Sequence, residues 1–152
     1  MEIFRFVVGT KKVPLVEEKY YVIEEKKLKD NVGVIETCIE GECNSKLLSF
    51  ELPRYYDRVD LSKKTPYITF KTPDGSVYKN KCVNFKYSDT KIRMSWLLGK
   101  EVCTTKGLVE CSIALVGKNS YGGSYALRTT IFSINVLPSI FEECENVVEV
   151  DY

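Results

Sequence analysis

Two neighbouring stretches decide the fold of this chain, KIRMSWLL at Lys91–Leu98 and GLVECSIALV at Gly107–Val116. In the first stretch apolar and polar side chains alternate, which is typical of a β-strand with one buried and one solvated face. Trp96, the only tryptophan, belongs to the apolar row, and we predict that it anchors the core. The second stretch has an apolar row of its own. The loop between them is too short for a crossover helix, which predicts that the two strands are neighbours.

Strand patterns recur along the rest of the chain and are separated by turn residues such as Pro73-Asp74-Gly75. The conformation of residues 11–31 stays open, because Glu17–Asp30 has many charges and could also form a helix of about three turns. Our preference there is a strand at Tyr20–Ile23. We predict an all-β fold, an antiparallel β-sandwich of immunoglobulin-like or jelly-roll-like type, with about eight strands and an extension at each end. The other predicted strands are Glu2–Val8, Val32–Ile39, Lys46–Leu52, Pro66–Thr72, Val77–Lys79, Lys81–Tyr87 and Tyr125–Leu137, with a shorter one at Val147–Val150.

The length of 152 residues fits one globular domain. Within it we distinguish N-terminal strands and an extension over 1–45, the β-sandwich over 46–137 and an acidic tail over 138–152. The net charge is +1, but Leu47–Leu137 carries 14 Lys and Arg against 7 Asp and Glu, whereas the tail has five acids and no base. The tail is either simply solvated or an arm that docks on a basic surface, its own or a neighbour's.

Several classes of chemistry are excluded or disfavoured by composition. The chain has no histidine, which removes Ser-His-Asp and Cys-His catalysis and histidine metal ligands. No apolar run is long enough for a membrane span, and Met1–Thr10 does not resemble a signal peptide, so we expect the protein to be made in a reducing cytoplasm. The six cysteines are then expected to be free thiols, with Cys111 in the core. Cys38 and Cys43 could form half a zinc site, but no second spaced pair completes it, and we expect no metal and no cofactor.

The remaining candidate functional groups are pairs of carboxylates and tyrosines in loops. The pairs Asp57 with Asp60 and Asp74 with Asp89 lie in turn-like contexts, where capping explains them better than catalysis. We therefore predict that the protein is not an enzyme. Tyrosines in loops beside basic residues can anchor a protein interface or, alternatively, stack on sugars in a carbohydrate-binding module. The predicted interface residues are Tyr55, Tyr56, Arg58, Tyr121, Tyr125, Glu142, Glu143 and Glu145.

The order of motifs resembles a known family over about Lys46–Leu137. The carrying features are Ile-x-Phe-x-x-Pro-Asp-Gly at Ile68–Gly75, the strand around Trp96, the strand that opens at Gly107, and Leu-Arg-Thr-Thr-x-Phe at Leu127–Phe132. In this order they resemble the N-terminal attachment domain of upper baseplate proteins and related tail or head fibre proteins of bacteriophages. The resemblance implies a β-sandwich that fastens a fibre or receptor-binding component to the virion, with neither enzyme activity nor a cofactor.

The chain also departs from the family pattern, since it stops about 15 residues after the predicted sandwich. We therefore expect a small adaptor or decoration on the baseplate, tail or capsid. Its expected partners are other virion proteins, including a fibre, and a second or third copy of itself in a dimer or trimer. We expect no binding to membranes or nucleic acid. The expected location is the virion, after assembly in the host bacterial cytoplasm.

Overall fold

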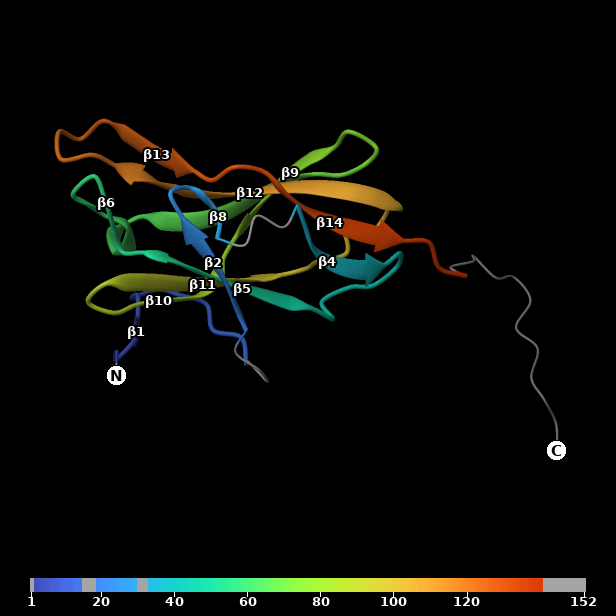
Figure 1. The fold of residues 1–152 in the computed structure, drawn as a ribbon, viewed down its shortest axis with the longest axis horizontal. Helices are drawn as coiled ribbons and strands as arrows, with labels where there is room; N and C mark the ends of the chain where they lie inside the picture. The colour runs from blue at the N-terminus through green and yellow to red at the C-terminus, as the bar shows by residue number, and fades with distance from the viewer. Residues whose placement is uncertain (1, 15–18, 30–32, 141–152) are drawn as a thin grey trace.

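The computed structural model describes residues 2–14, 19–29 and 33–140, and it is built almost entirely of β-strands packed as two layers (Figure 1). This confirms the predicted all-β sandwich. The other regular element in these residues is one 3-10 turn at Leu61–Lys63. Within the described part of the chain, no helix is long and apolar enough to cross a membrane.

The first sheet has six strands in the order β1-β10-β11-β5-β2-β3. The second sheet runs β4-β14-β12-β8-β9, with β13 also paired to β12, and a separate hairpin is formed by β6 and β7. The strands of the first sheet are β1 (Arg5–Phe6), β2 (Tyr20–Glu24), β3 (Lys27–Leu28), β5 (Leu47–Pro53), β10 (Val83–Tyr87) and β11 (Lys91–Leu97). The remaining strands are β4 (Val34–Ile39), β6 (Tyr55–Tyr56), β7 (Val59–Asp60), β8 (Thr65–Lys71), β9 (Val77–Lys81), β12 (Gly107–Lys118), β13 (Ser124–Arg128) and β14 (Phe132–Leu137).

The prediction that the two opening stretches are neighbouring strands was wrong. β11 lies in the first sheet and pairs with β10 and β5, whereas β12 is the central strand of the second sheet. The loop between them crosses from one layer to the other, a gap of about 10 Å that it spans easily. Each apolar row is buried against the opposite sheet. Trp96 in β11 packs on Phe70 in β8, with 5.3 Å between the ring centroids.

Most of the predicted strands are present, with shifted ends. β2 confirms the strand at Tyr20–Ile23, while the expected strand at Glu2–Val8 shortens to β1. Tyr125–Leu137 is interrupted at 129–131, so that it forms two strands along the same edge of β12. The interruption is stabilised by Thr129, which accepts a hydrogen bond from the Ile113 amide at 2.9 Å and donates its own amide to the Ile113 carbonyl at 3.0 Å. The predicted strand at Val147–Val150 lies outside the described residues.

Residues 1–45 contribute strands to both sheets. β2 pairs with β5 and β4 pairs with β14, and both pairings are parallel, a feature that the alternation pattern did not indicate. The N-terminal part of the chain therefore completes the sandwich. Its side chains also close the core: Ile23 of β2 and Cys38 of β4 are both 1% exposed.

Candidate interface at the tyrosine end

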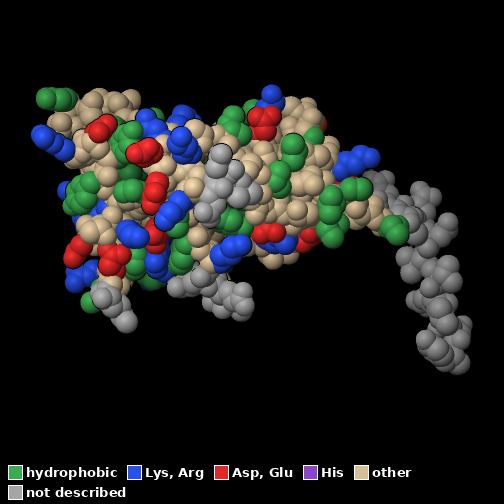
Figure 2. All heavy atoms as spheres, viewed as in Figure 1, with side chains coloured by type: hydrophobic (Ala, Val, Ile, Leu, Met, Phe, Trp, Pro, Cys, Tyr) green, Lys and Arg blue, Asp and Glu red, His purple; other side chains and the backbone are tan. Residues whose placement is uncertain are grey.

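Three connections meet at the end of the sandwich where β6 lies, at the left of Figure 1: the β2–β3 turn, the β6–β7 hairpin and the β12–β13 hairpin. We call this surface the tyrosine end. In Figure 2 its visible face shows Lys or Arg side chains interspersed with Asp or Glu. It comprises Tyr55, Tyr56, Tyr121 and Tyr125 together with Lys26, Asp57, Arg58 and Lys64.

Two of the four tyrosines are brought together and have cations over their rings. The Lys26 ammonium lies 5.0 Å from the Tyr56 ring centroid, and the Lys64 ammonium lies 4.9 Å from that of Tyr125. Burial raises the pKa of Tyr125, and the nearby Asp57 carboxylate adds to this rise. Tyr56 and Tyr125 are both partly buried against the core. They therefore form the partly buried base of the tyrosine end.

The other two tyrosines project from this base into solvent. Tyr55 is 51% exposed and Tyr121 is 94% exposed. Asn119 orders the loop that carries Tyr121, because its side-chain oxygen accepts hydrogen bonds from the amides of Tyr121 and Gly123, both at 2.9 Å. Such Asx-type bonds replace backbone pairing in a turn. A large aromatic side chain is thus displayed to solvent on an ordered hairpin tip.

The two short turns at this end have an uncommon backbone conformation. Glu25 and Lys26 have φ of 50° and 67°, and Asp57 and Arg58 have φ of 46° and 68°. Hairpin turns that require two consecutive positive φ values normally use Gly, Asn or Asp, and any other residue there, as at Glu25, Lys26 and Arg58, costs about 1 kcal/mol. Charged side chains are retained at four such positions on one surface. Strain of this kind concentrates at binding sites, where it supports a hypothesis of function.

Arg54 fixes the base of the β6–β7 hairpin. Its guanidinium donates two hydrogen bonds of 3.0 Å to the Asp60 carboxylate and a third of 3.1 Å to the Ser88 carbonyl. It also lies between the rings of Tyr55 and Tyr87, at 5.2 Å and 4.9 Å from their centroids. Burial opposes ionisation of Asp60, but the hydrogen bonds from Arg54 and Ser62 prevail and lower its pKa to about 2. Asp60 also accepts the Ser62 amide and caps the 3-10 turn.

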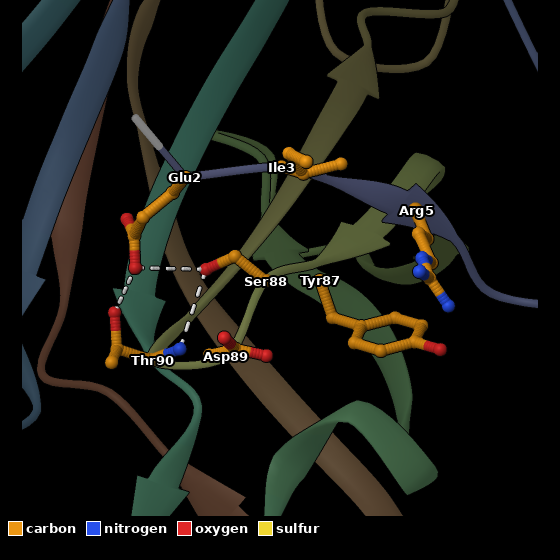
Figure 3. A pocket seen from close by; sticks show the side chains of 7 residues that line it. All are labelled: Glu2, Ile3, Arg5, Tyr87, Ser88, Asp89 and Thr90. Atoms are coloured by element: carbon orange, nitrogen blue, oxygen red, sulfur yellow. Dashed lines mark hydrogen bonds between the residues drawn. The ribbon is translucent and has the colours of Figure 1, made fainter.

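A hollow of about 420 Å³, the N-terminal pocket, adjoins the tyrosine end on the other side of Tyr87 (Figure 3). In Figure 3 the Glu2 carboxylate points toward the hydroxyls of Ser88 and Thr90, which both donate hydrogen bonds to it, and Arg5 lies beside Tyr87. The pocket therefore has a hydrogen-bonded acid on one side and a cation with an aromatic ring on the other. Its lining residues are Glu2, Ile3, Arg5, Tyr87, Ser88, Asp89 and Thr90.

The structure thus brings Tyr55, Tyr56, Arg58, Tyr121 and Tyr125 to one end of the molecule. Glu142, Glu143 and Glu145 lie outside the described residues. Lys26 and Lys64 are not among the predicted residues, because nothing in the sequence indicates that they lie beside Tyr56 and Tyr125. Asp57 was predicted only as a turn residue, and its proximity to Tyr125 arises from the fold. Asn119 could have been found, since Asn followed by Ser-Tyr-Gly-Gly is typical of an Asx turn.

The other candidate groups lie elsewhere. Asp74 accepts hydrogen bonds from the Thr72 hydroxyl and the Ser76 amide, the capping role that its turn predicted. Burial raises the pKa of the Cys82 and Cys111 thiols, which sit in the core. Across residues 2–14, 19–29 and 33–140, no three Cys, Asp or Glu side chains are grouped as metal ligands would be.

No protein-family model matches this sequence, and no curated protein matches it. Among solved structures, the fold is similar to the N-terminal domain of phage TP901-1 ORF48, with a TM-score of 0.45 and 10% sequence identity. The similarity covers 67% of this chain and 83% of that one. The similarity is distant.

Proposed function

We propose that this protein is a small structural component of a bacteriophage virion, an adaptor or decoration that binds other virion proteins through its tyrosine end. The observation that supports this best is the convergence of exposed tyrosines, strained charged turns and the N-terminal pocket on one end of a rigid sandwich. The virion assignment itself comes from the resemblance of the motifs over Lys46–Leu137 to phage attachment domains.

The physical character of the tyrosine end suits a protein interface. Tyrosine supplies a large contact area at low cost in conformational entropy, and such residues dominate binding when they enter a partner's pocket. Tyr55 and Tyr121 are the exposed anchors, and both stand on turns fixed by hydrogen bonds. Little ordering is then needed on binding, so more of the contact energy appears as affinity.

A carbohydrate-binding role has less support. A sugar stacks on the face of an aromatic ring, and the rings of Tyr55, Tyr56 and Tyr125 each already have a cation over a face. A binding role is also preferred over catalysis. The described carboxylates whose pKa is lowered are Glu42, Glu51, Asp60 and Asp74, and each serves in an ion pair or a turn.

Sedimentation of virions tests the proposal. Purified tagged protein is mixed with virions grown without it, and the bound fraction is measured after a density gradient. We expect the protein to sediment with virions and the double variant Tyr55→Ala/Tyr121→Ala to lose most of this binding. Val77→Ala, which trims a side chain that is 65% exposed at the opposite end, is the matched control and should bind normally. Recovery of the protein only from the soluble fraction would overturn the virion assignment.

A second variant pair separates the side chain from the fold. Arg58→Gly relieves a positive φ while removing a charged side chain from the tyrosine end, so it should bind virions less well without any loss of stability. Asn44→Gly relieves a similar φ of 55° in the β4–β5 loop at the other end and should not affect binding. Equal binding by both variants would place the attachment surface elsewhere on the molecule.

A further inference from the structure

Two buried thiols face each other where the second sheet meets the loop that joins the two sheets. The Sγ atoms of Cys38, in β4, and Cys103, in the β11–β12 loop, are 3.0 Å apart. Each residue is only 1% exposed. The separation is about 1 Å longer than the covalent S–S bond of about 2.05 Å. The pair joins parts of the chain that are 65 residues apart in sequence.

The backbone around the pair holds the two segments together. The Gly41 amide donates a 2.9 Å hydrogen bond to the Cys103 carbonyl, which ties the end of β4 to the loop. The loop itself consists of turns, with the Val102 amide bonded to the Gly99 carbonyl and the Cys103 amide to the Lys100 carbonyl, both at 3.2 Å. A turn-rich loop can move by a fraction of an ångström more easily than a central strand.

We propose that Cys38 and Cys103 are a latent disulfide, which closes when the protein meets a peroxide. The step is balanced in two stages. One of the two sulfurs attacks hydrogen peroxide, and its proton leaves with the released hydroxyl as one water, which gives a sulfenic acid. The other sulfur then displaces the sulfenic hydroxyl to form the S–S bond, and its proton leaves with that hydroxyl as a second water. Both thiols are oxidised, and the peroxide is reduced.

The buried environment of the two thiols slows their oxidation. Burial raises the pKa of both thiols, that of Cys103 to about 12. Attack by thiolate is therefore slow, and a small peroxide suits this buried pair better than a bulky disulfide reagent.

The bond would tie an edge strand to the connection between the sheets. β4 is the last strand of the second sheet and is held on one side only, by its parallel pairing with β14. A cross-link that closes a loop of this length should raise the unfolding temperature by roughly 5–15 °C. The occasion for oxidation, release of a virion from the reducing cytoplasm, rests on the proposed function, but the chemistry does not.

The test uses the full chain with Cys43→Ser and Cys144→Ser. Cys43 must be replaced because the tryptic peptide 30–46 holds both Cys38 and Cys43, and Cys144 is replaced because it lies outside the described residues. The folded protein is treated with hydrogen peroxide, alkylated in denaturant and digested. We expect peptide 30–46 to be joined to peptide 101–106, with release by dithiothreitol and a higher unfolding temperature before reduction.

The controls discriminate among the buried thiols. Adding Cys38→Ser should abolish the joined peptide, whereas adding Cys111→Ser should leave it unchanged. If Cys38→Ser does not fold, the unsubstituted pair still decides the matter by mass spectrometry. Full alkylation of both thiols after peroxide, or oxidation of either to sulfinic acid without a joined peptide, would overturn the proposal. Virion binding is measured separately, so its failure cannot be mistaken for the absence of this bond.

Discussion

Trp96 joins the two sheets through a single side chain. It is 1% exposed, its ring packs on Phe70, and its indole Nε1 donates a 3.1 Å hydrogen bond to the Asn80 side-chain oxygen. Both partners belong to the second sheet, whereas Trp96 belongs to the first. The predicted core anchor therefore also connects the two layers.

Two substitutions of Trp96 separate the contribution of its packing from that of its hydrogen bond to Asn80. Trp96→Ala should lower the free energy of unfolding by about 3–5 kcal/mol, because it leaves a cavity between the sheets. Trp96→Phe keeps most of the volume and should lose only about 1–2 kcal/mol, chiefly from the missing hydrogen bond. Both losses are measured by urea unfolding followed by circular dichroism, because the variants lack the only tryptophan and cannot be followed by its fluorescence. An unchanged unfolding midpoint for Trp96→Ala would contradict this account.

Asp60 makes stability depend on acid pH. Its pKa is about 2 in the folded state against an ordinary 3.8, because its bonds to Arg54 and Ser62 outweigh the effect of burial. Because the pKa of Asp60 is lower in the folded state, its ionised carboxylate stabilises the fold at any pH above the ordinary pKa of 3.8. That stabilisation, about 2 kcal/mol, should be lost as the pH falls from about 4 to 2. Asp60→Asn should be less stable at pH 7 and should lack this part of the acid dependence in urea titrations at a series of pH values.

Asn84 determines how the N-terminal segment attaches to the first sheet. It has a φ of 53° at an irregularity in the pairing of β10 with β11, and it is 3% exposed. Its side chain accepts the Val13 amide at 2.6 Å and donates to the Val13 carbonyl at 2.8 Å, while its own amide donates to the Lys11 carbonyl. The buried Asn84 side chain thus makes two hydrogen bonds with the Val13 backbone, as the backbone of a neighbouring strand would.

Asn84→Gly should release this segment selectively. Glycine accepts the positive φ, so the backbone of β10 can be kept while both side-chain bonds to Val13 are lost. We expect faster hydrogen exchange over residues 5–13 and a loss of about 1–2 kcal/mol in stability, with the core strands still protected. Asn44→Gly controls for the effect of glycine at a positive φ. Loss of protection throughout the sandwich would instead make the segment part of the core.

Two edge strands of the second sheet, β4 and β9, are protected in different ways. On β4, the Tyr21 hydroxyl donates to the Ile35 carbonyl and the Glu42 carboxylate accepts the Ile39 amide, so side chains occupy polar groups of the strand. The edge strand β9 carries two lysines, Lys79 and Lys81. Lysine on an edge strand discourages pairing with another sheet. Each edge is thus protected, one by hydrogen bonds and the other by charge.

At the scale of the whole molecule, the segment after β14 is the natural candidate for contacts between copies. Leu137 ends the strand, the Ser139 hydroxyl donates a 3.0 Å hydrogen bond to the Glu40 carbonyl, and Ile140 is 92% exposed. Beyond this point the sequence is acidic, while the sandwich carries an excess of basic residues. We keep the expectation of a dimer or trimer as a proposal that this charge arrangement supports.

Deleting residues 141–152 tests that proposal. The contact between Ser139 and Glu40 is retained, so we expect an unchanged unfolding temperature. The oligomer, measured by light scattering, should dissociate more readily, and virion binding should weaken through the loss of multivalency. A large fall in the unfolding temperature would instead assign this segment to the core.

How far the sequence could predict the candidate site depends on the distance between its residues along the chain. Tyr55 and Tyr121 could be recognised as loop tyrosines from their neighbours alone. The placement of Lys26 over Tyr56, and of Asp57 near Tyr125, could not be predicted, because each pair joins separate hairpins. Tertiary folding alone decides which loops share an end of the sandwich.

The sequence by itself determined that this chain is all-β and that the apolar rows of Lys91–Leu98 and Gly107–Val116 are buried, because alternation of side chains is a local property of an extended backbone. It did not determine the neighbours of each strand. Two alternating strands can be neighbours in one sheet or can face each other across the core, and their sequences look the same in both cases. Only the tertiary structure therefore placed β11 and β12 in opposite layers. The same step brought Cys38 to Cys103, since contacts between distant segments depend on how the strands are ordered in the sheets.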